Sequence, residues 1–179
     1  MPLALRTPRL LLREWRDDDI ASFAAMSADP EGMRYLPSLD TAAAEAWVAR
    51  MRRHFDEHGF GNFVVELPGH VSFIGVVGLN WVRWDLVFTP AVEAGWRLMP
   101  AYWGKGYAFE AARTTIDDGF GRLGLDEIVA YTVPTNRASW TVMERLGMTR
   151  DPAEDFDHPG RPEGDPLRRH LLYRLRRAG

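Results

Sequence analysis

The sequence predicts an α/β fold in which helices flank a mixed central β-sheet. Residues 92–98 are rich in strand-forming side chains, and apolar residues then recur at helical spacing from Ala108 to Leu123. A β-branched run, 127–133, follows this helix, so the two strands are expected to be parallel neighbours. Residues 61–66 and 71–80 flank a Pro-Gly turn and predict an antiparallel hairpin in the same sheet.

The segment before the hairpin predicts one strand and three helices. Residues 9–15 form the strand, and the aspartates at 17–19 are interpreted as caps of a first helix rather than as metal ligands. This helix ends at Asp29-Pro30, and a short second helix is expected to hold Met33, Tyr35 and Leu36. A longer helix over 41–57 carries the apolar stripe Ala44, Trp47, Val48, Met51 and Phe55.

The C-terminal part predicts a helix that begins near Asn136 and a last strand near 169–175. A segment rich in proline and aspartate, 151–165, is the one long loop. No internal repeat and no low-complexity linker interrupts the chain. We therefore expect one domain over residues 1–179.

Composition excludes several kinds of protein. The chain has 179 residues, a formal net charge of −3 and no cysteine. Disulfides, thiolate metal sites and an acyl-cysteine intermediate are therefore excluded, and direct nucleic-acid binding is not expected. No apolar run reaches the roughly 20 residues of a membrane span, and no signal-peptide pattern is present. A cytoplasmic protein is expected. His54 and His58 lie one turn apart without an evident third ligand, so no metal site is predicted.

The turn between the 92–98 strand and the helix carries the main functional signal. Gly104 and Gly106 permit backbone conformations and close approach that side chains forbid, and they precede the first free N–H groups of the helix. Such a turn binds phosphate or diphosphate, helped by the helix dipole. It matches neither the P-loop nor the GxGxxG pattern. A purely structural glycine turn is the alternative.

Two motifs resemble those of the GNAT superfamily of acetyltransferases. The run 103–108, WGKGYA, is similar to the [QR]xxGx[GA] loop of that family, although Trp103 stands in the Gln/Arg place. Asn136-Arg137-Ala138-Ser139, followed by Gly147-Met148, resembles the Asn-containing helix and the Gly-Phe corner of the same family. With the segment 156–159, FDHP, the likeness points to the RimJ/RimL branch.

The resemblance implies acetyl-CoA as co-substrate, without a metal. The parallel strands would splay apart, the pantetheine arm would fill the gap, and the diphosphate would bind the N–H groups of 103–108. The side chain of Lys105 either adds charge there or points to water. The implied cofactor-binding residues are Trp96, Arg97, Leu98, Met99, Trp103, Gly104, Lys105, Gly106, Tyr107, Ala108, Asn136 and Ser139.

The catalytic residues are expected to be Ser139 and Glu93. Many GNAT enzymes carry a tyrosine proton donor where this chain has Met143, so Ser139 is interpreted as the substitute donor, with a capping role as the alternative. Glu93 lies on the strand that would hold the acetyl group and is interpreted as the base. A surface pair with Arg97 is the competing interpretation. Asp157 and His158 are second candidates for the base.

The acceptor is expected to be a primary amine, with a protein or peptide N-terminus favoured. At pH 7 roughly a tenth of α-amines but under a thousandth of lysine side chains are neutral. Tyr35, Glu93 and His158 are the candidate substrate-binding residues, although Tyr35 has a packing role as its alternative. A small amine such as an amino acid, polyamine or antibiotic, a CoA-binding module without turnover, and a protein-interaction scaffold are the other hypotheses. A monomer or homodimer is expected.

Overall fold

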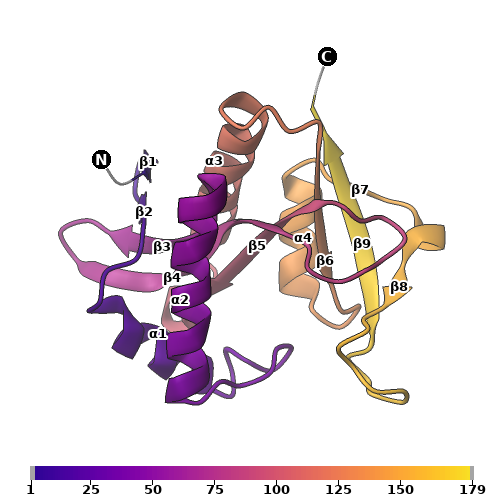
Figure 1. Ribbon diagram of the computed structural model, residues 1–179, viewed down its shortest axis with the longest axis horizontal. Helices are drawn as coiled ribbons and strands as arrows, with labels where there is room; N and C mark the ends of the chain where they lie inside the picture. Colours follow the sequence, from indigo (N-terminus) through magenta and orange to yellow (C-terminus); the bar gives the residue numbers. More distant parts are fainter. Residues whose placement is uncertain (1–2, 178–179) are drawn as a thin grey trace.

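The computed structural model describes residues 3–177. Its strands form one twisted sheet in the order β1-β2-β3-β4-β5-β6-β9-β7, and β8 pairs with β9 (Figure 1). The strands are β1 (Ala4–Arg6), β2 (Leu11–Arg13), β3 (Asn62–Leu67), β4 (Val71–Trp81), β5 (Val92–Leu98), β6 (Glu127–Thr132), β7 (Thr149–Arg150), β8 (Phe156–Asp157) and β9 (Arg169–Arg176).

The sheet is divided at the junction of β5 and β6. Every described neighbouring pair is antiparallel except this one, which is parallel. The parallel pair has a single register position, Glu93 opposite Val129. In Figure 1 the two strands run apart from this point, so that an N-terminal and a C-terminal half of the sheet meet only along a short stretch.

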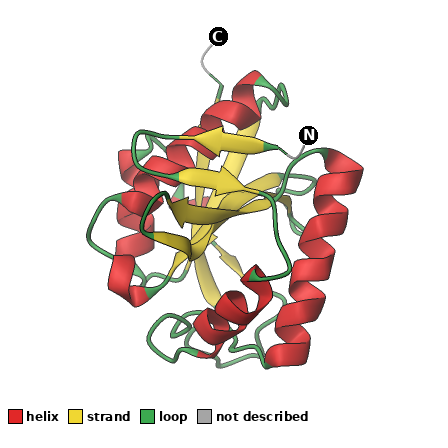
Figure 2. Cartoon of the chain, turned by 90° about the vertical axis from the view of Figure 1, so that its left-hand side faces the viewer, coloured by secondary structure: helices red, strands yellow, loops and turns green. Residues whose placement is uncertain are grey.

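Four α-helices cover the two faces of the sheet (Figure 2). One face carries α1 (Asp19–Ala28) and α2 (Thr41–His58), whose Phe23 and Trp47 rings stack 4.6 Å apart. On the other face, Gly119 of α3 (Tyr107–Gly121) lies directly over Leu79 and Ile128. Helix α4 (Arg137–Arg145) contacts β6. Within the described residues no helix is long and apolar enough to cross a membrane.

The strongly patterned elements confirm the sequence predictions. The long helix spans Thr41–His58, and its stripe residues Ala44, Val48, Met51 and Phe55 are buried. The β3–β4 hairpin, β5, α3 and β6 lie within a residue or two of their expected bounds. The α/β class with a mixed sheet and a splayed parallel pair is confirmed.

Three local predictions were wrong. The expected helix at Met33, Tyr35 and Leu36 is a succession of turns, because only isolated bonds such as Met33 N–H to the Asp29 carbonyl form there. The first strand is limited to Leu11–Arg13 and pairs with a further short strand, β1. The loop 151–165 contains a 3₁₀ turn, Pro152–Glu154, and β8.

A buried ionic cluster ties the N-terminal half together. Arg13 on β2 donates to both carboxylate oxygens of Asp19, at 2.7 and 2.8 Å, and to Glu66 on β3 at 2.8 Å. Arg13 and Asp19 are only 5% and 3% exposed. The capping role expected for the aspartates at 17–19 is therefore wrong for Asp19: the N-cap of α1 is Asp18, which makes no side-chain cap bond, and Asp19 is the ion-pair partner of Arg13. Its carboxylate also accepts the N–H of Arg16 and anchors the start of the helix to the sheet.

Replacing Arg13 by glutamine is expected to lower the free energy of unfolding by about 3–5 kcal/mol, because it leaves the buried carboxylate of Asp19 without its counter-charge. Denaturant unfolding measures this change. Arg16→Gln is the matched control: Arg16 also approaches Glu66, at 3.8 Å, but its side chain is 61% exposed. Its loss is expected to cost less than about 1 kcal/mol. Equal effects of the two variants would contradict this account of the cluster.

Candidate active site

The glycine turn presents a run of unpaired main-chain donors. After β5 a 3₁₀ turn, Pro100–Tyr102, leads to Gly106, which is the N-cap of α3. Gly104 and Gly106 have φ values of 71° and 80°, in the left-handed region that favours glycine. The first bond of the helix is donated by Glu110 to the carbonyl of Gly106. Among the described residues, the N–H groups of 104–109 therefore have no acceptor, as an anion site requires.

A basic hollow adjoins this turn. It measures about 350 Å³ and includes three arginines and Glu110 among its lining residues, which are Pro8, Arg9, Gly106, Phe109, Glu110, Arg113, Thr114 and Arg145. Arg9 donates to the carbonyl of Lys105 at 3.0 Å and pairs with Glu110 at 2.6 Å, yet its side chain stays 47% exposed. The protein's own side chains therefore lie beside the turn and do not fill the space in front of its N–H groups. An anion with several phosphate groups fits this arrangement of donors and positive charge.

Three residues at the turn that were expected to contact the cofactor have groups with partners inside the protein. The N–H of Trp103 already donates to the Pro100 carbonyl, and its indole donates to Leu98, so the free donors begin at Gly104. The side chain of Lys105 turns back to the Ala101 carbonyl at 3.0 Å. The N–H of Met99 donates to Ile74 on β4. Tyr107 lies under the guanidinium of Arg9, and Ala108 supplies its main-chain N–H.

The gap between β5 and β6 is lined by main-chain N–H groups. Because Met99 bonds to β4 and alternate residues of an antiparallel strand face the same neighbour, Arg97 also bonds toward β4. Trp96 and Leu98 then direct their N–H groups toward β6. The parallel pairing has ended before them, so these two groups lack a strand partner. Both were predicted as cofactor contacts.

Glu93 lies at the start of this gap. Its half-buried carboxylate is on the face that α1 and α2 cover. Burial raises the pKa of Glu93 to about 7, while a hydrogen bond with the Tyr131 hydroxyl and the charge of Arg83 act in the opposite direction. A carboxylate with this pKa accepts a proton efficiently near neutral pH. The structure has no ion pair between Glu93 and Arg97 within residues 3–177, contrary to the competing surface-pair interpretation.

Asn136 and Ser139 lie at the start of α4, next to the end of β6. Asn136 caps the helix: its side-chain oxygen accepts the Ser139 N–H at 3.4 Å, and its amide donates to Thr132. The hydroxyl of Ser139 has no hydrogen-bond partner within the described chain, so it remains available as a donor. Met143 is 2% exposed and packs in the core, as expected for a residue without proton chemistry.

Tyr35 lies in the turns between α1 and α2, and His158 lies directly after β8. The Tyr35 hydroxyl donates to the Thr135 carbonyl at 3.0 Å, and Arg161 reaches the Tyr35 carbonyl, so this segment bridges the two halves. His158 packs among Trp84, Tyr131 and His170. Burial and the neighbouring His170, Arg161 and Arg83 lower its pKa to about 4. It is therefore a poor base, and Asp157 is paired with Arg168 and Arg169.

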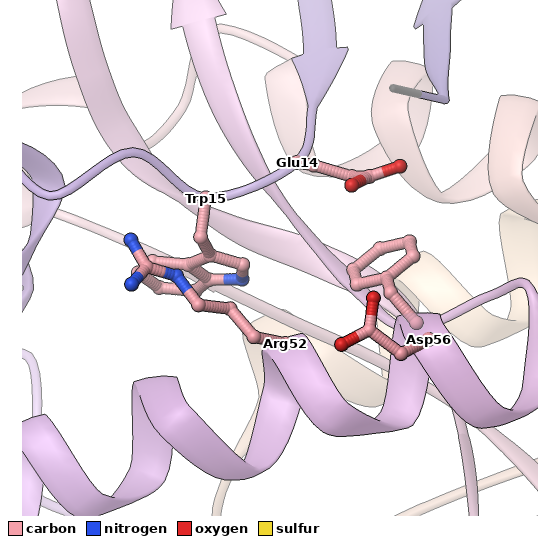
Figure 3. A pocket seen from close by; sticks show the side chains of 5 residues that line it. Glu14, Trp15, Arg52 and Asp56 are labelled. Carbon is pink, nitrogen blue, oxygen red and sulfur yellow. The ribbon is translucent and has the colours of Figure 1, made fainter. Parts of the chain in front are cut away.

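A second hollow lies away from these residues. It lies between the end of β2 and helix α2, and its lining residues are Glu14, Trp15, Arg52, Phe55 and Asp56 (Figure 3). This hollow shares no lining residue with the basic hollow beside the glycine turn. No group of three potential metal ligands occurs among the residues that the structure describes.

The sequence reasoning missed part of the site. Arg9, Arg113 and Arg145 come from three separate segments, so no local pattern could join them. One signal was available in the sequence. Arg113 follows Gly106 by seven residues, or about two helical turns, so its side chain lies on the helix face that begins at the glycine turn.

Comparisons with known proteins agree with this geometry. Residues 9–149 match the model of the acetyltransferase (GNAT) domain family. An uncharacterized N-acetyltransferase of Bacillus subtilis is 31% identical over 149 residues, which cover 82% of this chain and 83% of the relative. A crystal structure of an acetyltransferase from Agrobacterium tumefaciens superposes with a TM-score of 0.77 at 31% identity, over 98% of this chain and 95% of that one.

RimJ from Mycobacterium smegmatis, in complex with CoA-disulfide, shares the fold with a TM-score of 0.73 at 22% identity, over 98% of this chain and 86% of that one. The fold, the open N–H groups of the glycine turn and the family match lead to one conclusion: this chain belongs to the GNAT family of acetyltransferases.

Proposed function

We propose that this GNAT enzyme transfers the acetyl group of acetyl-CoA directly to a primary amine, and that a peptide N-terminal α-amine is the acceptor class. The observation that carries the proposal is the position of Glu93 on the strand whose Trp96 and Leu98 N–H groups face the gap. A base and two carbonyl-polarising donors then serve the same reacting centre.

The diphosphate of the donor binds the N–H groups of 104–108, and Arg9, Arg113 and Arg145 add positive charge beside it. The pantetheine arm lies between β5 and β6. Its acetyl oxygen accepts a hydrogen bond from the N–H of Trp96 or Leu98, which stabilises the negative charge that develops as the amine attacks.

Proton transfer completes the reaction. Glu93 takes the proton that the amine loses, the new C–N bond forms, and the C–S bond breaks. The departing thiolate receives a proton from the Ser139 hydroxyl or from water. Because a thiolate is a good leaving group, a weak donor is sufficient here.

The pKa values favour an α-amine over a lysine side chain. Glu93, with a pKa of about 7, exchanges protons readily with an α-amine of pKa about 7.7–8.0 and poorly with a lysine of pKa about 10.4. The motifs that resemble the RimJ/RimL branch favour the same acceptor class. Small-molecule amines are the second candidate class. Incubation with acetyl-CoA and a panel of peptides and small amines, followed by mass detection of the added acetyl group, tests the proposal.

Gly106→Val is expected to weaken acetyl-CoA binding at least about tenfold, because a β-branched residue is strained at φ 80° and displaces the N–H groups of the turn. Isothermal titration calorimetry measures the Kd. Gly69→Val is the matched control, since Gly69 has φ 77° in the β3–β4 turn, far from the site. It should lose stability but bind normally. Normal binding by Gly106→Val would refute the placement of the diphosphate.

Glu93→Gln is expected to lower kcat/KM by about 10²–10⁴-fold, the usual loss when a general base is removed. In the wild-type enzyme, activity should fall as the pH drops below about 7, because Glu93 becomes protonated and can no longer accept a proton. The variant should lose this acidic limb of the pH profile of kcat/KM. An unchanged acidic limb in the variant would exclude Glu93 as the base.

Ser139→Ala is expected to lower kcat several-fold while the Kd of CoA changes little, because the hydroxyl serves the departing thiolate and makes no bond that holds the fold. Steady-state kinetics and calorimetry measure the two quantities. Ser139→Cys keeps a weak donor and should recover part of kcat. A wild-type kcat for Ser139→Ala would assign the donor role to water.

A further inference from the structure

An open position lies in the middle of β5, between a carboxylate and a guanidinium. Strand alternation directs Glu93, Gly95 and Arg97 to the face that α1 and α2 cover. A Cβ atom built on Gly95 would meet no atom within 4 Å. The sheet surface at Gly95 is therefore free, and the two charged side chains flank it along about 13 Å of strand.

Arg97 has no acidic partner in this space. One guanidinium nitrogen donates to the sulfur of Met33 at 3.4 Å, and the guanidinium carbon lies 5.2 and 5.6 Å from the ring centres of Phe23 and Trp47. No carboxylate within residues 3–177 forms a salt bridge with it. Among the described residues, the other two guanidinium nitrogens have no hydrogen-bond partner, and they are not among the fully buried atoms, so they are available to a ligand.

The aromatic rings fix the orientation of Arg97. Phe23 and Trp47 stack on each other and both attract the guanidinium through their ring faces. Burial lowers the pKa of Arg97 to about 10, so the side chain remains charged at neutral pH. A charged guanidinium that is held in place with free donors is suited to bind a planar anion, and a carboxylate matches its geometry best.

An unpaired acceptor lies at the opposite end of the open position. Asn80 on β4 is the register partner of Glu93, so both side chains project from the same face about 5.5 Å apart at the Cα atoms. The side-chain oxygen of Asn80 is buried, and no donor among the described residues reaches it. Such an orphaned oxygen is costly unless a ligand supplies the donor.

We propose that the acceptor of this enzyme is an amine that also carries a carboxylate. Its amine lies between Glu93 and Asn80, its backbone passes over Gly95, and its carboxylate pairs with Arg97. One small molecule or one peptide end then supplies an amine donor to Glu93 and Asn80 and a carboxylate acceptor to Arg97. The inference rests on the acetyl transfer proposed above. An acidic N-terminal residue narrows the peptide acceptor, whereas a free amino acid belongs to the second, small-molecule class.

The carboxylate has two sources, and matched acceptors distinguish them. Peptides of one sequence that begin with Asp or Glu, against the same peptides beginning with Asn or Gln, test a side-chain carboxylate. Free amino acids against their C-terminal amides test an α-carboxylate. In one of these sets the carboxylate acceptor should exceed its amide in kcat/KM at least about tenfold, because a site built for a polar group discriminates strongly against its absence.

Arg97→Gln should reduce this carboxylate-to-amide ratio to near one, whereas Arg97→Lys should keep part of it through the retained charge. Asn80→Ala is the control on the amine side: it should raise KM for carboxylate and amide acceptors alike and leave the ratio unchanged. A ratio near one in the wild-type enzyme, or an Arg97→Gln variant that loses both acceptors equally, would overturn the proposal.

A binding measurement separates failure of this inference from failure of the proposed function. Calorimetric titration of the wild-type protein saturated with CoA, which cannot transfer acetyl, measures acceptor affinity without turnover. Tighter binding of the carboxylate acceptors, lost in Arg97→Gln, would support the site even if no acetylated product formed. Equal affinity for carboxylate and amide in this complex would refute the site whether or not acetylation occurs. Thermal melts of each variant confirm that it is folded.

Discussion

The early end of the pairing between β5 and β6 is the constraint on which the rest of the site depends. A parallel pair normally satisfies its N–H groups along its whole length, yet here only Glu93 and Val129 are in register. The twist then separates the strands and leaves the donors of Trp96 and Leu98 unused. The two halves of the sheet keep their antiparallel partners, β4 and β9, so the gap does not weaken either half.

The same divergence explains why the glycine turn is open. Strand β5 ends at the gap, and the chain must turn sharply to place α3 behind the sheet. Gly104 and Gly106 make this turn with positive φ, and the six N–H groups of 104–109 project from it. The anion site and the carbonyl site are therefore parts of one piece of backbone. Their spacing is set by the strand and turn, not by flexible side chains.

The sequence predicts those features that form a regular residue pattern within a single helix, strand or turn. The stripe of α2, the alternation of β5 and the glycine spacing of the turn each leave a local pattern, and each was confirmed. Contacts between distant segments leave no such pattern. Arg9, Arg113 and Arg145 meet only because β1–β2, α3 and α4 converge, and the Asp19–Arg13 pair depends on the register of β2 with β3. The segment around Met33 has helical composition, but too few residues to propagate a helix after Pro30.

The burial that raises the pKa of Glu93 also lowers the stability of the folded protein near neutral pH. In the unfolded chain this carboxyl ionises near its usual pKa of 4.5, whereas in the folded chain its pKa is about 7. Between these values the folded state binds more protons than the unfolded state, so this residue's contribution to stability decreases as the pH rises from about 4.5 to 7. Above pH 7 the folded protein carries a desolvated charge, which Tyr131 and Arg83 partly offset. An amine bound beside Glu93 would supply a third favourable partner, so acceptor binding and the ionisation of this carboxylate strengthen each other.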